Sequence, residues 1–275
     1  MDRNFKMRRI AAKTQIRIPN FLALSVVALS LGACAKMNDV TGSVGAQPKT
    51  ESELRQHTDQ LARRYDSNPR DKANGLAYAR ALRALSRNAE AVAVMQALAI
   101  AHPQDFDVLG AYGKALAEAG RLREAADVLT RAHAPERPNW SILNAQGSVA
   151  DQLGDHVRAQ EYYSAALKIA PNEPSILSNL GLSYAMAKRL PQAEQHLRQA
   201  AQSPAADMRV RQNLSLVLAL QGKFTEAEDV ARRDLSPANA AASIASIRAM
   251  IAQSNTWREI QKLDGAPSKK PKQSS

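Results

Sequence analysis

An amphipathic unit of two helices recurs along the chain with a period close to 34 residues, and this period limits the possible folds more than any other feature. In the unit spanning 140–171, apolar and small residues recur at three- and four-residue spacing on two stripes separated by Gly154. Such spacing predicts two helices, each with one apolar face, joined by a turn. Pro171 should end the second helix, because proline lacks an amide hydrogen and its ring clashes with the preceding turn.

Copies of this unit occupy most of the chain. The prolines at positions 69, 103, 135, 171, 204 and 237 are separated by 34, 32, 36, 33 and 33 residues. A single hairpin cannot bury its apolar face, whereas stacked copies bury a continuous core. The spacing of small, bulky, alanine and proline positions resembles the tetratricopeptide repeat (TPR), whose signature extends over about 34 residues.

This resemblance implies an all-α fold, a right-handed superhelical TPR solenoid of about five helix-turn-helix repeats with terminal capping helices. The composition agrees, because 45% of the residues are hydrophobic but only 4% are aromatic, which leaves mainly alanine and leucine. The solenoid is expected over residues 51–262. Its repeats are predicted at 72–102, 106–134, 140–171, 174–203 and 208–236, with single capping helices at 51–65 and 238–253 and a further short helix near Trp257.

Three repeats carry local features with structural consequences. Gly147 and Ala159 are small residues that should face each other where the two helices of the third repeat cross. The fourth repeat has Lys188 where the second and third repeats have the turn glycines Gly120 and Gly154, which leaves the geometry of that turn open. The fifth repeat has Ser215 in place of the crossing glycine and Ala231 in place of a bulky residue, which predicts looser packing.

Residues 1–33 resemble a bacterial lipoprotein signal peptide. Six basic residues precede an apolar run at 21–31, which is shorter than the ~20 residues that a membrane-spanning helix needs. The motif Leu31-Gly32-Ala33-Cys34 follows, and Cys34 is the only cysteine in the chain. The resemblance implies that Cys34 is lipidated. An ordinary signal peptide with an incidental cysteine is the alternative.

The segments beside the solenoid are predicted to be flexible. Residues 34–50 contain glycine, serine and proline without helical periodicity and should form a lipidated tether. Residues 263–275 should form a disordered basic tail. Because residue 35 is alanine and not aspartate, the chain resembles lipoproteins sorted to the bacterial outer membrane, where it would face the periplasm.

Charge and motifs argue against nucleic-acid binding and catalysis. The net charge of +11 falls to +6 without residues 1–33, which hold six basic residues and one acidic residue. The five histidines lie in separate units and form no metal-binding motif, and His156 is expected at a solvated turn. No catalytic residue, metal site or cofactor site is predicted, and the chain is not expected to be an enzyme.

A TPR superhelix uses the first helix of each repeat to line a concave groove, and the resemblance therefore implies a set of inward-facing residues. Such a groove suits an extended peptide or a helix of a partner protein, held by amide and basic side chains. The alternative is that these residues form solvated helix faces and that binding occurs elsewhere. The predicted groove residues are Arg80, Arg83, Lys114, Asn144, Ser148, Ser178, Arg209 and Gln212, with Asp151 on the same face.

The lipoprotein-like segment, the short tether and the repeats together resemble the TadD family, the TPR lipoproteins of tight-adherence (Flp) pilus systems. The resemblance implies a non-enzymatic adaptor in the assembly of a Flp (type IVb) pilus or secretion machine, with the outer-membrane secretin as the expected partner. Related TPR pilotins of type IV pili are a close alternative. Two others are an adaptor that recruits peptidoglycan hydrolases or proteases, and a subunit of an outer-membrane protein assembly complex.

Overall fold

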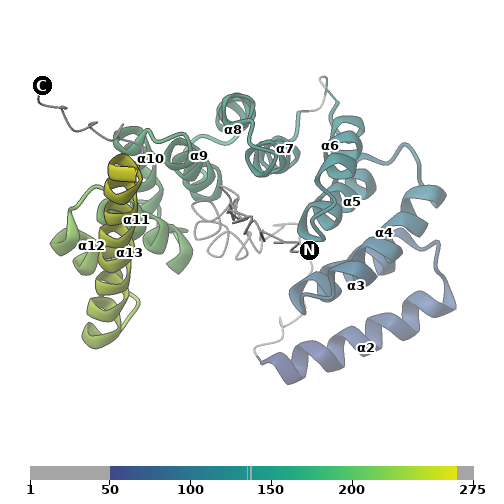
Figure 1. Ribbon diagram of the computed structural model, residues 1–275. Coiled ribbons are helices and arrows are strands. Elements are labelled where there is room, and N and C mark those ends of the chain that lie inside the picture. The colour runs from purple at the N-terminus through teal and green to yellow at the C-terminus, as the bar shows by residue number, and fades with distance from the viewer. Residues whose placement is uncertain (1–49, 135, 137, 265–275) are drawn as a thin grey trace, which may run out of the picture. The chain divides into compact units, whose positions relative to one another are not determined.

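The computed structural model describes residues 50–134, 136 and 138–264, all within the unit Lys36–Ser275. Every regular element among them is an α-helix (Figure 1). The predicted signal peptide, Cys34 and almost all of the tether lie outside the described residues. The helices are α2 (Glu51–Ser67), α3 (Lys72–Ala84), α4 (Asn88–Ala101), α5 (Phe106–Glu118), α6 (Leu122–Arg131), α7 (Trp140–Gln152), α8 (His156–Ile169), α9 (Pro174–Met186), α10 (Leu190–Ala201), α11 (Met208–Leu220), α12 (Phe224–Ala231) and α13 (Pro237–Asp264).

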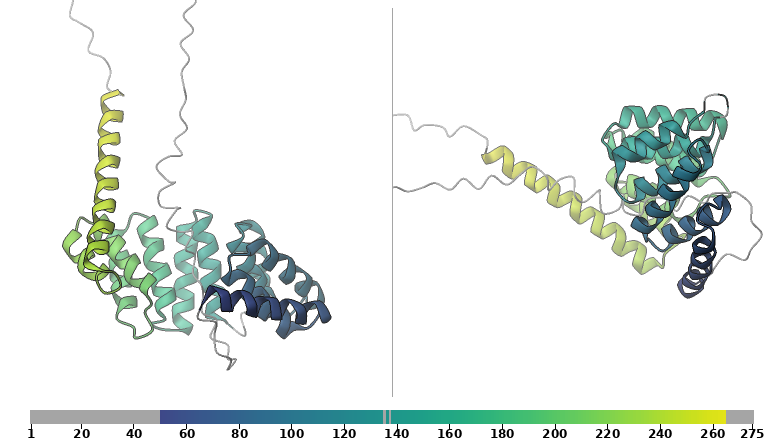
Figure 2. Two further views of the ribbon diagram at one scale, coloured as in Figure 1. Left: turned by 90° about the horizontal axis from the view of Figure 1, so that it is seen from below. Right: turned by 90° about the vertical axis from the view of Figure 1, so that its right-hand side faces the viewer.

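The helices form five hairpins in chain order, from α3 with α4 to α11 with α12, and each hairpin packs against the next. The first helix of each repeat also contacts the first helix of the following repeat. A single helix stands at each end, α2 against α3 and α13 against α11 and α12 (Figure 2). The predicted all-α solenoid of stacked helical hairpins is therefore confirmed.

The first helix of every repeat begins at a capping residue, and these residues recur with a strict 34-residue period. Each cap accepts a hydrogen bond from a backbone amide in the first turn, which satisfies a donor that has no partner within the helix. This period is more regular than the proline spacing and gives each repeat the same length. The caps are Asp71, Asp105, Asn139, Glu173 and Asp207.

The turn within each hairpin uses one residue in the left-handed region, again at a 34-residue period. Glycine adopts this conformation without a steric penalty, whereas other residues pay roughly 1–2 kcal/mol. Lys188 has φ 61°, close to the turn glycines, so the fourth repeat keeps the common turn despite its missing glycine. The five residues and their φ values are Ser86 (59°), Gly120 (76°), Gly154 (86°), Lys188 (61°) and Gly222 (79°).

In the second, third and fourth hairpins, a glycine at the helix crossing leaves room for one bulky side chain on the partner helix. A Cβ atom on Gly147 would lie 2.5 Å from Cε1 of Tyr163, which is 1% exposed, as expected for the predicted close crossing. In the fifth repeat, Ser215 donates a hydrogen bond to the Ala227 carbonyl at 2.8 Å. Ser215 and Ala231 are both buried at this crossing. Looser packing in the fifth repeat therefore stays a prediction.

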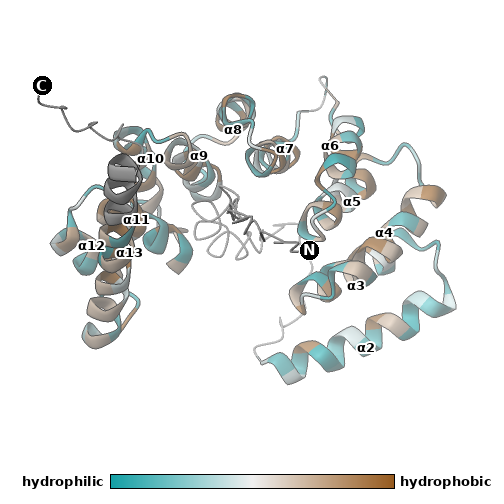
Figure 3. Ribbon diagram, in the orientation of Figure 1, coloured by the Kyte–Doolittle hydropathy of each residue, from teal (hydrophilic) through white to brown (hydrophobic). Residues whose placement is uncertain are grey.

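One helix caps each end of the array, and the C-terminal one is longer than predicted. Helix α2 has a capping box between Thr50 and Glu53 and buries only Thr58 and Leu61, and it is mostly hydrophilic in Figure 3, as a terminal cap should be. Helix α13 runs without interruption to Asp264, whereas the sequence predicted a break after residue 253. Residues 265–275 of the predicted tail lie outside the described residues. No glycine or proline occurs between residues 238 and 264, so nothing interrupts the helix.

Candidate interaction surface

Only part of the predicted groove is available to a partner. The eight residues all lie on the first helices α3, α5, α7, α9 and α11, as expected. Arg80 on α3 and Gln212 on α11 are exposed, and Ser148 on α7 is half-buried. The other five make contacts within the array.

Two of the predicted arginines are engaged in ion pairs. Arg83 donates two hydrogen bonds to Glu118 on the next first helix, at 2.7 Å from Nε and 2.6 Å from Nη2, and its side chain is only 11% exposed. Arg209 pairs with the capping residue Asp207 at 2.7 Å. Planar two-point contacts of the Arg83 kind orient both partners as well as attracting them. Arg83 thus ties the first repeat to the second.

Three further predicted groove residues are buried and bridge neighbouring repeats. Lys114 Nζ donates to Ser141 Oγ at 2.8 Å. Asn144 is 1% exposed, and its Oδ1 accepts a hydrogen bond from Asn179 at 3.0 Å. Ser178 Oγ accepts a hydrogen bond from Asn213, also at 3.0 Å. The prediction that Asn144 lies on a solvated face is therefore wrong, because the first helix of the next repeat covers it.

A buried polar cluster centres on Asp151 at the end of α7. Its carboxylate accepts hydrogen bonds from Ser183 Oγ at 2.7 Å, Tyr163 Oη at 3.1 Å and His156 Nδ1 at 2.8 Å. Burial raises the pKa of Asp151 above its usual value, although the three donors oppose that shift. His156 is thus not the ordinary solvated residue that the sequence predicted.

The 34-residue period contains a signal for this cluster. The positions equivalent to Asp151 in the last four repeats are otherwise alanine, at 117, 185 and 219. Ser183 likewise stands where the other four repeats have alanine or valine. Two adjacent repeats that both replace an apolar residue with a polar one predict a contact between those residues. Asp151 accordingly joins the third repeat to the fourth and is not free for a partner.

The inner face also carries an apolar patch that the groove prediction missed. Leu182 and Met186 lie one helical turn apart on α9, and Leu216 and Leu220 lie at the equivalent positions on α11, 34 residues later. Leu220 is 42% exposed, and the other three are partly exposed. We call these four residues the apolar patch.

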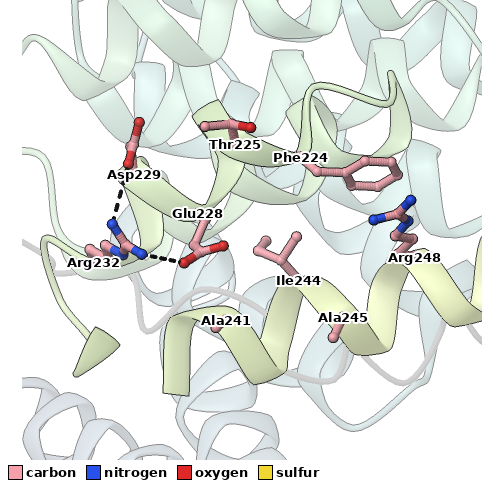
Figure 4. A pocket seen from close by; sticks show the side chains of 9 residues that line it. All are labelled: Phe224, Thr225, Glu228, Asp229, Arg232, Ala241, Ile244, Ala245 and Arg248. Atoms are coloured by element: carbon pink, nitrogen blue, oxygen red, sulfur yellow. Dashed lines mark hydrogen bonds and ion pairs between the residues drawn. The ribbon is translucent and has the colours of Figure 1, made fainter. Parts of the chain in front are cut away.

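Other features of the described residues offer little chemistry. A cavity of about 320 Å³ lies between α12 and α13, but its charged groups already have partners (Figure 4). Arg232 pairs with Glu228 at 2.5 Å, and the Arg248 guanidinium lies 5.2 Å from the centre of the Phe224 ring. No cluster of potential metal ligands occurs among residues 50–134, 136 and 138–264, which the structure describes. Each helix among the described residues is too short or too polar to span a membrane.

Comparison with known proteins supports the repeat assignment. The tetratricopeptide repeat family model matches residues 76–139 and 144–207. The uncharacterized protein y4yS of Sinorhizobium fredii (strain NBRC 101917 / NGR234) is 33% identical over 115 residues, which cover 42% of this chain and 63% of that protein. The match thus spans less than two thirds of the relative's length.

Solved structures share the fold at low sequence identity. PilW, a widely conserved type IV pilus biogenesis factor, aligns with a TM-score of 0.61 and 16% identity over 70% of this chain and 91% of PilW. TTC0263, a thermophilic TPR protein in Thermus thermophilus, aligns with a TM-score of 0.54 and 21% identity over 61% of this chain and 91% of that one. With the hairpin geometry, these similarities show that the described part of the chain has the fold of a tetratricopeptide-repeat solenoid.

Proposed function

We propose that this chain is a lipid-anchored adaptor in the assembly of a tight-adherence (Flp, type IVb) pilus, where it acts on the outer-membrane secretin. One combination carries the proposal: a lipoprotein-like segment ending at Cys34 precedes a TPR array that aligns with 91% of the pilus biogenesis factor PilW. TPR arrays are typically scaffolds for protein contacts. The similarity to PilW concerns the fold, and the pilus role is our inference from it.

The array suits an adaptor because its own polar groups hold it together. The contacts of Arg83, Asn144 and Asp151 all link successive first helices. A scaffold of this kind presents a preformed surface, so a partner that docks on it need not first order the repeats. The lipid on Cys34 would keep that surface at the periplasmic side of the outer membrane.

Gene deletion followed by complementation tests the proposal in cells. Deletion should abolish surface pili and reduce the multimeric secretin in the outer-membrane fraction, and the wild-type gene should restore both. Cys34→Ala should fail to restore them at a normal protein level, because the unlipidated chain would be unprocessed or released into the soluble periplasm.

Two results would count against this proposal. Normal piliation in the deletion strain would exclude the pilus role and make recruitment of hydrolases or proteases the leading alternative. If the Cys34→Ala protein is processed and still stays with the membranes after a carbonate wash, as the wild type does, the anchor is assigned to the wrong residue.

A further inference from the structure

The inner face of the array changes in character between the third and the fourth repeat. At the two positions that form the apolar patch, the first three repeats have Arg80 and Ala84, Lys114 and Glu118, and Ser148 and Gln152. Only the fourth and fifth repeats have large apolar residues at both positions. The change thus falls between α7 and α9.

The patch is separate from the apolar core of the same helices. On α11, Leu214, Val217 and Leu218 pack into the core with Ile244 of α13, and Leu218 is fully buried. Leu182, Met186, Leu216 and Leu220 belong to none of the core clusters of the described residues. Helix α13 therefore covers the core side of α11 and leaves the patch partly exposed.

The surroundings of the patch are cationic. Helices α9 and α11 contain no acidic residue. Lys188 and Arg189 follow Met186 closely in the turn after α9, and neither is buried. The acidic residue nearest in sequence on the following helix, Glu194, is already held by Arg198 and Lys223 at 2.7 and 2.6 Å. An acidic partner would meet the positive charges of Lys188 and Arg189 here.

The chemistry of the patch also favours a helix over an extended segment as its occupant. An extended backbone laid on four apolar side chains would lose its water without gaining hydrogen bonds, and unpaired buried amides are costly. Asn179 and Asn213 on the same two helices each already donate a hydrogen bond within the array, to Asn144 and Ser178. A helix satisfies the hydrogen bonds of its own backbone. It also presents apolar residues at three- and four-residue spacing, ~5–6 Å apart, which matches the one-turn spacing of the two patch residues on each of α9 and α11.

We infer that the apolar patch of Leu182, Met186, Leu216 and Leu220 is the docking site for an amphipathic helix of the partner, with acidic residues beside its apolar stripe. This inference rests on the proposed adaptor function and names the class of element that the adaptor takes. Of the two occupants expected for the groove, an extended peptide and a partner helix, it selects the helix.

A labelled model peptide tests the inference even while the partner protein is unidentified. The probe is a 20-residue amphipathic helix with leucines on one face and glutamates beside them, and its binding to the full-length chain is measured by fluorescence anisotropy. Leu220→Glu should weaken binding at least tenfold. Ile100→Glu alters a more exposed apolar residue on α4, 76% exposed, and should leave binding unchanged. Leu216→Gln provides a second patch variant if Leu220→Glu fails to fold.

Two altered peptides test the occupant itself. Prolines at two central positions should abolish binding, and lysines in place of the glutamates should weaken it at least tenfold. Equal binding of the proline peptide would overturn the helical occupant, and equal binding of the lysine peptide would overturn the charge match. Equal binding of the probe to both patch variants and the wild type would overturn the site.

Complementation separates this inference from the proposed function. A deletion strain that expresses Leu220→Glu should lack pili, whereas Ile100→Glu should restore them. If the wild-type gene and Leu220→Glu both restore pili, the adaptor role stands and the patch is rejected. If the deletion strain is fully piliated, the pilus role fails, and the peptide measurements still decide whether the patch binds a helix.

Discussion

Single residues set the distance between helices, and Gly147 is the sharpest case. It lies where α7 crosses α8, with the Tyr163 ring 2.5 Å from the place that a Cβ atom would occupy. Gly147→Leu should lower the free energy of unfolding by about 1–3 kcal/mol, the usual cost of overpacking, because Tyr163 is buried and has little room to move. Urea unfolding followed by circular dichroism measures the change.

The neighbouring residue provides the control for this substitution. Ser148→Leu introduces the same side chain at a half-buried position on the inner face and should change the stability little. An unchanged free energy of unfolding for Gly147→Leu would mean that the crossing is placed at the wrong residue.

Sequence spacing predicted the crossing at Gly147 but not the burial of Asn144, and the reason is physical. A helical period tells which residues share a face of one helix. Whether that face is covered depends on the neighbouring helix. Here that helix is α9, whose Asn179 contacts Asn144 from 35 residues further along the chain. Asn144→Glu would therefore bury an unpaired charge and destabilise the array, whereas Gln212 is exposed and could be replaced without that cost.

At the scale of helices, the boundaries could be predicted well because they depend on local chemistry. The first helices begin at capping residues, and the turns contain glycine or a residue such as Lys188 that adopts the same backbone conformation. The sequence did not predict the uninterrupted course of α13, because the polar content after residue 253 resembles the end of a helix. Only the absence of glycine and proline between residues 238 and 264 indicates that the helix continues past residue 253.

An ion-pair cluster holds the last two repeats together, and Glu194 on α10 is its centre. Burial raises the pKa of Glu194, but hydrogen bonds from Lys223, Arg198 and Gln221 outweigh this and lower the value from 4.5 to about 2. The folded state therefore stabilises the ionised form of the Glu194 side chain relative to the unfolded state. Its contribution to stability is present above pH 4.5 and is lost as the pH falls toward 2.

Glu194→Gln tests this contribution. Near pH 7 it should lower the stability by about 1 kcal/mol, less than for a fully buried pair, because Lys223 and Arg198 are partly exposed to solvent. Below pH 4.5 the stability of the wild type should approach that of the variant. Unfolding curves across this pH range provide the measurement, and two parallel pH profiles would show that Glu194 is not responsible.

At the scale of the whole array, contacts connect near neighbours along the chain. Each helix packs against its neighbours in sequence, and the first helix of a repeat also packs against the first helix of the adjoining repeat. The stability of such an array is approximately a sum of repeat and interface contributions, so a local change should spread over only one or two repeats. The 34-residue period of the sequence predicted this architecture. It did not predict the position of the apolar patch, because the period alone does not tell which equivalent positions stay exposed after the helices pack.

Removal of α13 tests this local coupling. A chain that ends after Leu235 loses Ala240 and Ile244, which are buried against the last repeat. Backbone amides in α11 and α12 should then exchange their hydrogens faster, because the core residues Leu214 and Leu218 become exposed to water. Amides in α3 to α6 should exchange as in the full chain, since no helix among them contacts α13. Hydrogen exchange measured by mass spectrometry resolves the two regions. Uniformly faster exchange in every repeat would show that the array unfolds as one cooperative unit, and stability could then not be assigned to neighbouring repeats.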